Sequence, residues 1–86
     1  MIAKNQDLKT NSLVEMYTKI VDKYQQYYYT DVMADCKSLL NIIQDIDTSN
    51  YNNLGWIALK NLQYDCQLLL DRCYWDNYDR IKRTLV

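Results

Sequence analysis

Residues 59–73 of this 86-residue chain read LKNLQYDCQLLLDRC, and this stretch decides the fold class. Its apolar residues recur at alternating spacings of three and four: Leu59, Leu62, Cys66, Leu69 and Cys73. Because an α-helix completes a turn in about 3.6 residues, this spacing places all of them on one helical face. The stretch therefore predicts an amphipathic helix whose apolar face belongs to a protein core.

The same periodicity extends in both directions and predicts an all-α fold. We expect three main helices near 12–28, 31–46 and 53–75, and a short fourth helix near 77–85. The expected architecture is a single domain over 1–86, a small three- to four-helix bundle built from antiparallel helical hairpins. The apolar positions predict this core: Leu39, Leu40, Ile43, Leu62, Cys66, Leu69 and Cys73. Three tyrosines share that spacing with aliphatic neighbours and are expected in the core as well: Tyr17, Tyr24 and Tyr78.

Polar residues predict where these helices begin and end. Ser12 followed by Glu15 is a capping-box pattern, so residues 1–11 are expected to be flexible. A break is expected near 28–31, with Thr30 or Asp31 as the next cap, although one bent helix over both segments is an alternative. Residues 45–53 are rich in Asp, Asn, Ser and Thr and predict a connection that ends at a cap, Asn52 or Asn53. Asp76 is expected to cap the last helix.

The composition argues against an enzyme. The chain has no histidine, the commonest general base and metal ligand, and it has no glycine-rich phosphate loop. Its three cysteines lie at apolar positions of the helical pattern, so buried free thiols are expected rather than a metal site. We expect no cofactor, no metal and no catalytic residues.

Charge and composition also constrain the compartment and the partners. A net charge of −1 makes nucleic acid an unexpected partner, since that class needs a basic footprint. Free thiols suit a reducing interior, and the chain shows neither a signal peptide nor an apolar run long enough to span a membrane. We therefore expect a cytoplasmic protein, in a cell or in an infected host cell. Abundant Tyr, Asn, Ile and Lys are typical of AT-rich genomes, including those of phages and mobile elements.

Residues 51–55 (Tyr-Asn-Asn-Leu-Gly), with Tyr64 nine positions after Gly55, resemble the opening of a tetratricopeptide repeat. Tyr29 precedes Tyr64 by 35 residues, close to the period of that family. The resemblance implies helix-turn-helix pairs and a peptide-binding groove. The chain departs from the pattern because Gln67 stands where a small residue is expected and the closing proline is absent. A plain helical bundle is the alternative.

Surplus aromatic residues indicate a binding surface. The chain carries nine tyrosines and two tryptophans, and aromatic side chains are enriched at interface hot spots. Consecutive helical positions diverge by about 100°, so the aromatic runs cannot all be buried. The expected partner-binding residues are Tyr28, Tyr29, Trp75, Arg80, Lys82 and Arg83, with Tyr51 and Trp56 as the next candidates.

The leading hypothesis is a small non-enzymatic protein-binding module that acts stoichiometrically, of the inhibitor, immunity, adaptor or chaperone type. Its partner is another protein, and self-association as a homodimer is a further possibility. The alternative is a homo-oligomer that binds a nucleotide or another small anion through Tyr and through Arg80, Lys82 or Arg83. The second alternative is a single-stranded nucleic-acid binder in which aromatic rings stack on bases.

Overall fold

The computed structural model describes the backbone of residues 2–85 and the side chains of residues 11–85. It contains three helices, α1 (Ile2–Gln25), α2 (Tyr29–Asp45) and α3 (Asn53–Leu85). No strand occurs among the described residues, and the predicted all-α fold is confirmed. None of these helices combines the length and the apolar character that a membrane span requires.

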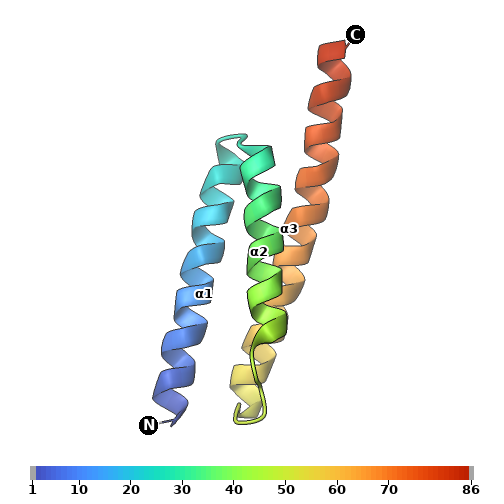
Figure 1. The fold of residues 1–86 in the computed structure, drawn as a ribbon. Helices are drawn as coiled ribbons and strands as arrows, with labels where there is room; N and C mark the ends of the chain where they lie inside the picture. The colour runs from blue at the N-terminus through green and yellow to red at the C-terminus, as the bar shows by residue number, and fades with distance from the viewer. Residues whose placement is uncertain (1, 86) are drawn as a thin grey trace.

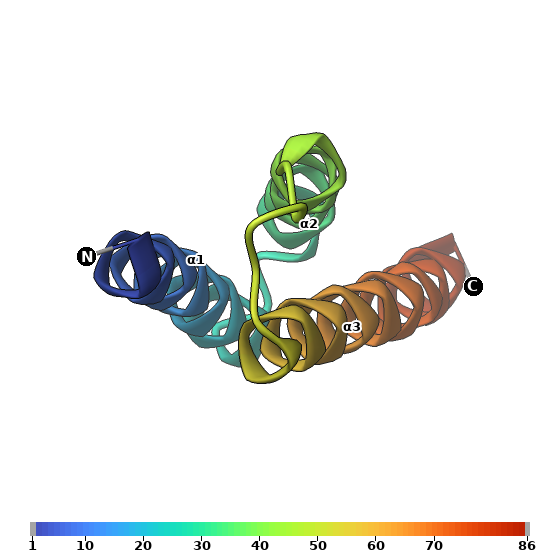
Figure 2. The ribbon, with the colours of Figure 1, turned by 90° about the horizontal axis from the view of Figure 1, so that it is seen from below.

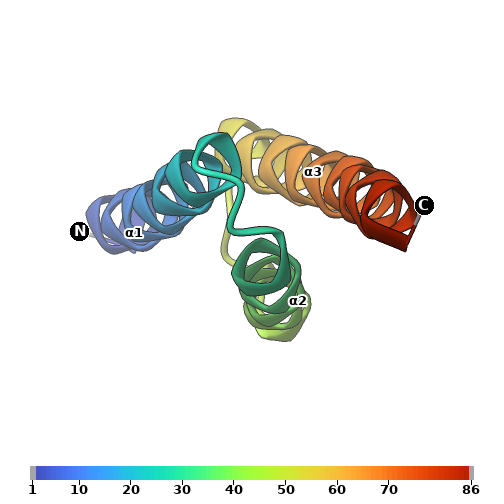
Figure 3. The ribbon, with the colours of Figure 1, turned by 90° about the horizontal axis from the view of Figure 1, so that it is seen from above.

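The three helices form an elongated body of 57 × 18 × 17 Å. α1 and α2 lie side by side and are joined by a short turn, while α3 returns along α2 and continues past that turn to the C-terminus (Figure 1). Viewed along the long axis from either end, α2 stands to one side of the line formed by α1 and α3 (Figures 2 and 3). α2 packs most extensively against α3. The C-terminal part of α3 therefore projects beyond its two neighbours.

The core is the seam where the apolar faces of the three helices meet. α1 contributes Leu13 and Ile20, and the remaining buried residues come from the other two helices: Val32, Cys36, Leu39, Ile43, Leu59, Leu62, Cys66 and Cys73. The seven leucine, isoleucine and cysteine residues predicted for the core all belong to this seam, although Leu40 and Leu69 are only partly buried against it. Tyr17 and Tyr24 also pack against the seam.

Tyr78 is not a core residue, and that prediction is wrong. Half of its side chain is exposed, and it lines a shallow surface pocket with Thr30 and Met33 of α2. Tyr78 follows the buried Cys73 by five residues, which turns it well away from the core face of α3.

Two predicted helix ends are also wrong. α1 begins at Ile2 rather than at Ser12, so the capping-box pattern lies inside a helix. The preceding residues include the good helix formers Lys4, Gln6 and Leu8 and contain neither proline nor glycine, so nothing stops the helix from extending. The expected flexibility of residues 1–11 stays a prediction, and residue 1 lies outside the described part of the chain.

The predicted break before a fourth helix does not occur, because α3 is continuous through residues 76–79. Asp76 does not cap a helix. Its carboxylate accepts a hydrogen bond from the Tyr24 hydroxyl of α1, which fixes this weak stretch against a neighbour. Tertiary contact thus overrides a run of poor helix formers.

The tetratricopeptide arrangement is likewise absent. Tyr64, which would mark the turn between two helices of such a repeat, lies within the uninterrupted α3. The chain therefore has no helix-turn-helix pair over residues 53–85.

The connection between α2 and α3 spans residues 46–52 and behaves as its composition predicts. Asp47 Oδ1 accepts a hydrogen bond from the Ser49 N–H at 3.0 Å, and Asn52 Oδ1 accepts one from the Gly55 N–H at 2.7 Å. Asn52 is thus the predicted cap of α3. A Cβ at position 55 would lie 3.1 Å from Asn52 Oδ1, so glycine keeps room for this cap.

Candidate partner-binding groove

A tight turn at residues 26–28 positions the tyrosine cluster. The Tyr28 N–H donates to the Lys23 carbonyl at 3.1 Å, and the Tyr27 N–H donates to the Tyr24 carbonyl at 3.0 Å. This pair of bonds is a Schellman motif, which ends a helix by placing one residue in the left-handed region. The break lies slightly before the predicted 28–31. Tyr28 occupies the N-cap of α2 without a side-chain cap bond, so the predicted caps Thr30 and Asp31 are wrong.

Tyr27 is the left-handed residue of this turn, with φ at 68°. Glycine usually fills that position, because a Cβ there costs about 1–2 kcal/mol. The Tyr27 side chain is 66% exposed, so burial of the ring does little to offset this cost. Backbone strain of this kind is concentrated at functional sites.

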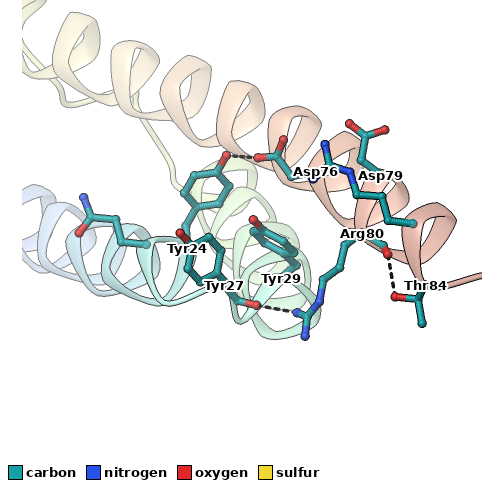
Figure 4. Close-up of a pocket in the computed structure, with 9 residues that line it drawn as sticks. Tyr24, Tyr27, Tyr29, Asp76, Asp79, Arg80 and Thr84 are labelled. Atoms are coloured by element: carbon teal, nitrogen blue, oxygen red, sulfur yellow. Dashed lines mark hydrogen bonds between the residues drawn. The ribbon is translucent and has the colours of Figure 1, made fainter.

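Tyr27 stands at the edge of a groove of about 930 Å³ between the turn and the projecting part of α3. Figure 4 shows Tyr24, Tyr27 and Tyr29 on one side and α3 side chains on the other. The α3 side is lined by Asp76, Asp79, Arg80, Arg83 and Thr84. The groove exists because α3 extends past the turn while α1 stops there.

Two hydrogen bonds join the walls of the groove (Figure 4). The Tyr24 hydroxyl donates to Asp76, and Arg80 Nη1 donates to the Tyr27 carbonyl at 3.3 Å. Behind them the rings form a cluster. The Tyr29 ring lies 5.7 Å from that of Tyr24 and meets the Tyr27 ring edge-on at 6.1 Å, distances typical of favourable aromatic pairs. The walls are therefore held at a defined separation.

The hydroxyls of Tyr24 and Tyr29 stay protonated at neutral pH. Burial, followed by the hydrogen bond to Asp76, raises the pKa of Tyr24 from 10.0 to about 12. Burial and the nearby Asp76 carboxylate also raise the pKa of Tyr29. The formal charge of the lining comes instead from two aspartates and two arginines, which balance each other.

The predicted site residues fall into three separate places. Tyr28, Tyr29, Arg80 and Arg83 lie at the turn and the groove. Trp75 and Lys82 are exposed on a different face of α3. Tyr51 and Trp56 lie at the opposite end of the molecule, by the 46–52 connection. The predicted set is therefore not one surface, and the binding role of each residue stays a prediction.

Each of these residues has a distinct environment. Tyr28 is 54% exposed, whereas Tyr29 is only partly exposed and packs against the core. Trp56 is exposed and lies 5.7 Å beneath the Lys60 ammonium group. The Tyr51 hydroxyl is buried and has no hydrogen-bond partner among the described residues.

Sequence reasoning missed Tyr24, Tyr27 and Asp76 as groove residues. The helical spacing predicts a core position for Tyr24, and the position of Asp76 before residues 77–85 predicts a helix cap. The sequence signal for Tyr27 was the run of three tyrosines at 27–29, which cannot all face inward. No sequence pattern shows which of the three takes the left-handed position.

The three thiols lie away from this groove, inside the core. Cys36, Cys66 and Cys73 are free and buried, as predicted. The Cys66 thiol donates to the Cys36 carbonyl at 3.5 Å, and the Cys73 thiol donates to the Tyr29 carbonyl at 3.3 Å. Hydrogen bonding to Cys66, together with burial, raises the pKa of Cys36, and burial raises that of Cys73. Over residues 11–85, no group of three or more Cys, Asp or Glu side chains is placed to hold a metal ion.

Comparison with known proteins found no match. No family model fits the chain, and neither a curated protein nor a solved structure is detectably similar to it.

Proposed function

We propose that this chain is a small non-enzymatic protein-binding module that acts stoichiometrically. It binds its partner at the groove beside the α1–α2 turn. In this proposal the helices serve as a small bundle of antiparallel hairpins, whose role is to hold the turn against the projecting end of α3. The partner occupies the space between the tyrosine rings and Arg80 and Arg83.

The observation that carries the proposal is the combination of backbone conformation and side-chain exposure at Tyr27. A large aromatic ring is kept largely exposed on a backbone conformation that favours glycine. Folding alone gains little from this arrangement, whereas an exposed and well-oriented tyrosine is a typical interface anchor. Arg80, which donates to the carbonyl of the same residue, fixes the orientation of the turn.

The charge of the groove favours a protein over a nucleotide or a nucleic acid. Asp76 and Asp79 line the same groove as Arg80 and Arg83, so a phosphate would meet carboxylates as well as guanidinium groups. A mixed surface of aromatic rings and both charge signs is instead typical of protein interfaces. The nucleotide-binding alternative remains an outcome of the test below.

The test uses Tyr27→Gly, because this variant separates binding from folding. Glycine removes the ring and relieves the left-handed conformation. The free energy of unfolding is therefore expected not to fall, and to rise by up to about 1 kcal/mol after the lost ring contact is counted. Capture of the partner from the source cells by the tagged chain is expected to drop at least tenfold, as for a hot-spot residue.

The matched control is Val14→Ser, which changes an exposed apolar side chain of α1 far from the groove. It should capture the partner as the parent chain does. Equal capture by Tyr27→Gly and the parent would overturn the assignment of the groove. A rise in melting temperature with nucleotides, in place of a captured protein, would favour the alternative.

A further inference from the structure

The outer face of α3 carries a second apolar stripe, separate from the core stripe. Counting from Ile57 in alternating steps of four and three gives nine positions that end at Leu85. Six of the nine are apolar or aromatic: Ile57, Tyr64, Leu68, Trp75, Tyr78 and Leu85. Because α3 is one uninterrupted helix, this spacing forms a continuous seam of the kind found in coiled coils.

The described part of the chain leaves this seam largely uncovered. Its six apolar side chains are between 47% and 81% exposed, and the three interruptions, Asn61, Asp71 and Lys82, are exposed too. The Trp75 ring is held edge-on between two tyrosines, 5.7 Å from the Tyr74 ring and 6.0 Å from the Tyr78 ring. A seam of this length is far more apolar surface than a lone helix normally presents to water.

We infer that a second copy of this chain covers the seam, with the two α3 helices packed antiparallel about a two-fold axis near residue 71. The inference is independent of the proposed function. Arg80 of the groove lies two positions from Tyr78 and from Lys82, and is thus rotated by about 160–200° around the helix from both seam positions. Arg80 and its contact with the Tyr27 carbonyl therefore lie on the side of α3 that faces away from the seam.

The seam is self-complementary in the antiparallel direction. Its apolar positions are distributed evenly about residue 71, with Ile57 and Tyr64 on one side and Tyr78 and Leu85 at matching distances on the other. Reversing a second copy therefore places apolar side chains on apolar side chains along the whole seam. A two-fold axis of this kind is the commonest symmetry of protein dimers.

Charge also selects the antiparallel direction. A parallel pair would align Lys82 with the partner's Lys82 and oppose like charges at that level, whereas the antiparallel pair brings Lys82 to the level of the partner's Asn61. The antiparallel pair separates the two Lys82 side chains by about 33 Å along the axis. It also brings the basic Lys82 toward the end of the second copy that carries Asp45 and Asp47.

The area is sufficient for a stable dimer. Fully covered aromatic side chains bury about 150–250 Å² each, so six half-exposed residues supply roughly 600 Å² of apolar surface per copy. With the flanking polar side chains this approaches the ~800 Å² per partner of a standard protein interface.

The first test measures the mass of the chain in solution by light scattering and sedimentation over a dilution series in the micromolar range. A mass of twice the chain is expected. Leu68→Lys should raise the dissociation constant at least tenfold, because each substitution acts twice across the two-fold axis. The matched control, Ile42→Lys, alters a similarly exposed aliphatic residue on α2 and should leave the dimer intact. A monomer throughout the series would overturn the inference.

The second test fixes the direction and does not depend on any destabilising substitution. Asp71→Cys places a thiol at an exposed position near the two-fold axis, where a short bismaleimide should join two copies. Ile57→Cys lies about 42 Å from its counterpart in the antiparallel pair and should not be joined. The parent chain, whose thiols are buried, gives the background. Equal joining of both variants would show a parallel pair and overturn the proposed geometry, and joining of neither would overturn the interface.

Discussion

At the scale of single residues, the contact between Tyr24 and Asp76 carries the most information. It joins positions 52 residues apart and ties the end of α1 to the projecting part of α3. Because the pKa of Tyr24 is raised, ionisation of its hydroxyl is coupled to loss of this contact.

This coupling predicts a specific alkaline instability. The folded-state pKa of Tyr24 lies above the ordinary value, so its contribution is fully present below pH 10 and is lost as the pH rises through about 12. Tyr24→Phe should therefore lose less stability than the parent over that interval. Urea unfolding at a series of pH values measures this, with Tyr64→Phe on the outer face of α3 as the control. Parallel pH profiles for Tyr24→Phe and the parent would contradict the prediction.

Sequence reasoning at this scale succeeds where the determinant is local. The Asn52 cap is read correctly, because a side chain three residues before its N–H donor suffices to make it. The left-handed Tyr27 is not readable, because the usual signal is glycine and the turn uses a tyrosine instead. The conformational cost of a tyrosine at this position follows from its positive φ angle, which only the structure gives.

At the scale of elements, periodicity identifies the helices and the faces that pack. The residues of α2 and α3 that meet in the core follow the spacing of three and four, and they are the residues that the structure buries. Periodicity does not show that α3 runs on past residue 75. That continuation is stabilised by contacts such as Tyr24 with Asp76, which join distant parts of the chain and leave no local pattern.

The packing between elements predicts that two leucines of the expected core contribute unequally to the free energy of unfolding. Leu39 of α2 is fully buried in the core, whereas Leu69 of α3 is only partly buried against it. Leu39→Ala should lower the free energy of unfolding by about 2–5 kcal/mol, and Leu69→Ala by less, because a partly exposed site leaves a smaller cavity. Denaturant unfolding monitored by circular dichroism gives both values. Equal costs would mean that the core is centred elsewhere.

At the scale of the whole molecule, the three thiols report on global unfolding. Cys36, Cys66 and Cys73 come from two helices and share one core, so no local opening exposes them together. The raised pKa values of Cys36 and Cys73 lower their thiolate fractions further, whereas hydrogen bonding with Cys36 lowers the pKa of Cys66, whose protection rests on burial.

Modification by a thiol reagent is therefore expected to be slow in buffer and to accelerate in step with the unfolded fraction as urea is added. Mass spectrometry should show unmodified and triply modified chains with few intermediates. Fast labelling of one cysteine in buffer would show that part of the core opens independently.

The overall shape is the feature that the sequence predicts least. The all-α fold and most of the core residues are predictable from the spacing of the apolar residues and from the composition. The break between α1 and α2 is predictable too, but the overhang of α3 is not, because it requires a helix that runs through residues 76–79 and is fixed there by Tyr24 of α1. The groove follows from that overhang, and so only its individual tyrosines and arginines were within reach of sequence reasoning.

The overhang also sets an order of events during synthesis. Contacts between α1 and α2 join near neighbours in the chain and belong to the rapid class of folding events, of microseconds to milliseconds. The walls of the groove, by contrast, come from residues as far apart as Tyr24 and Thr84. A ribosome must therefore release almost the entire chain before the groove exists, and a prematurely terminated product carries the tyrosines without the arginines that face them.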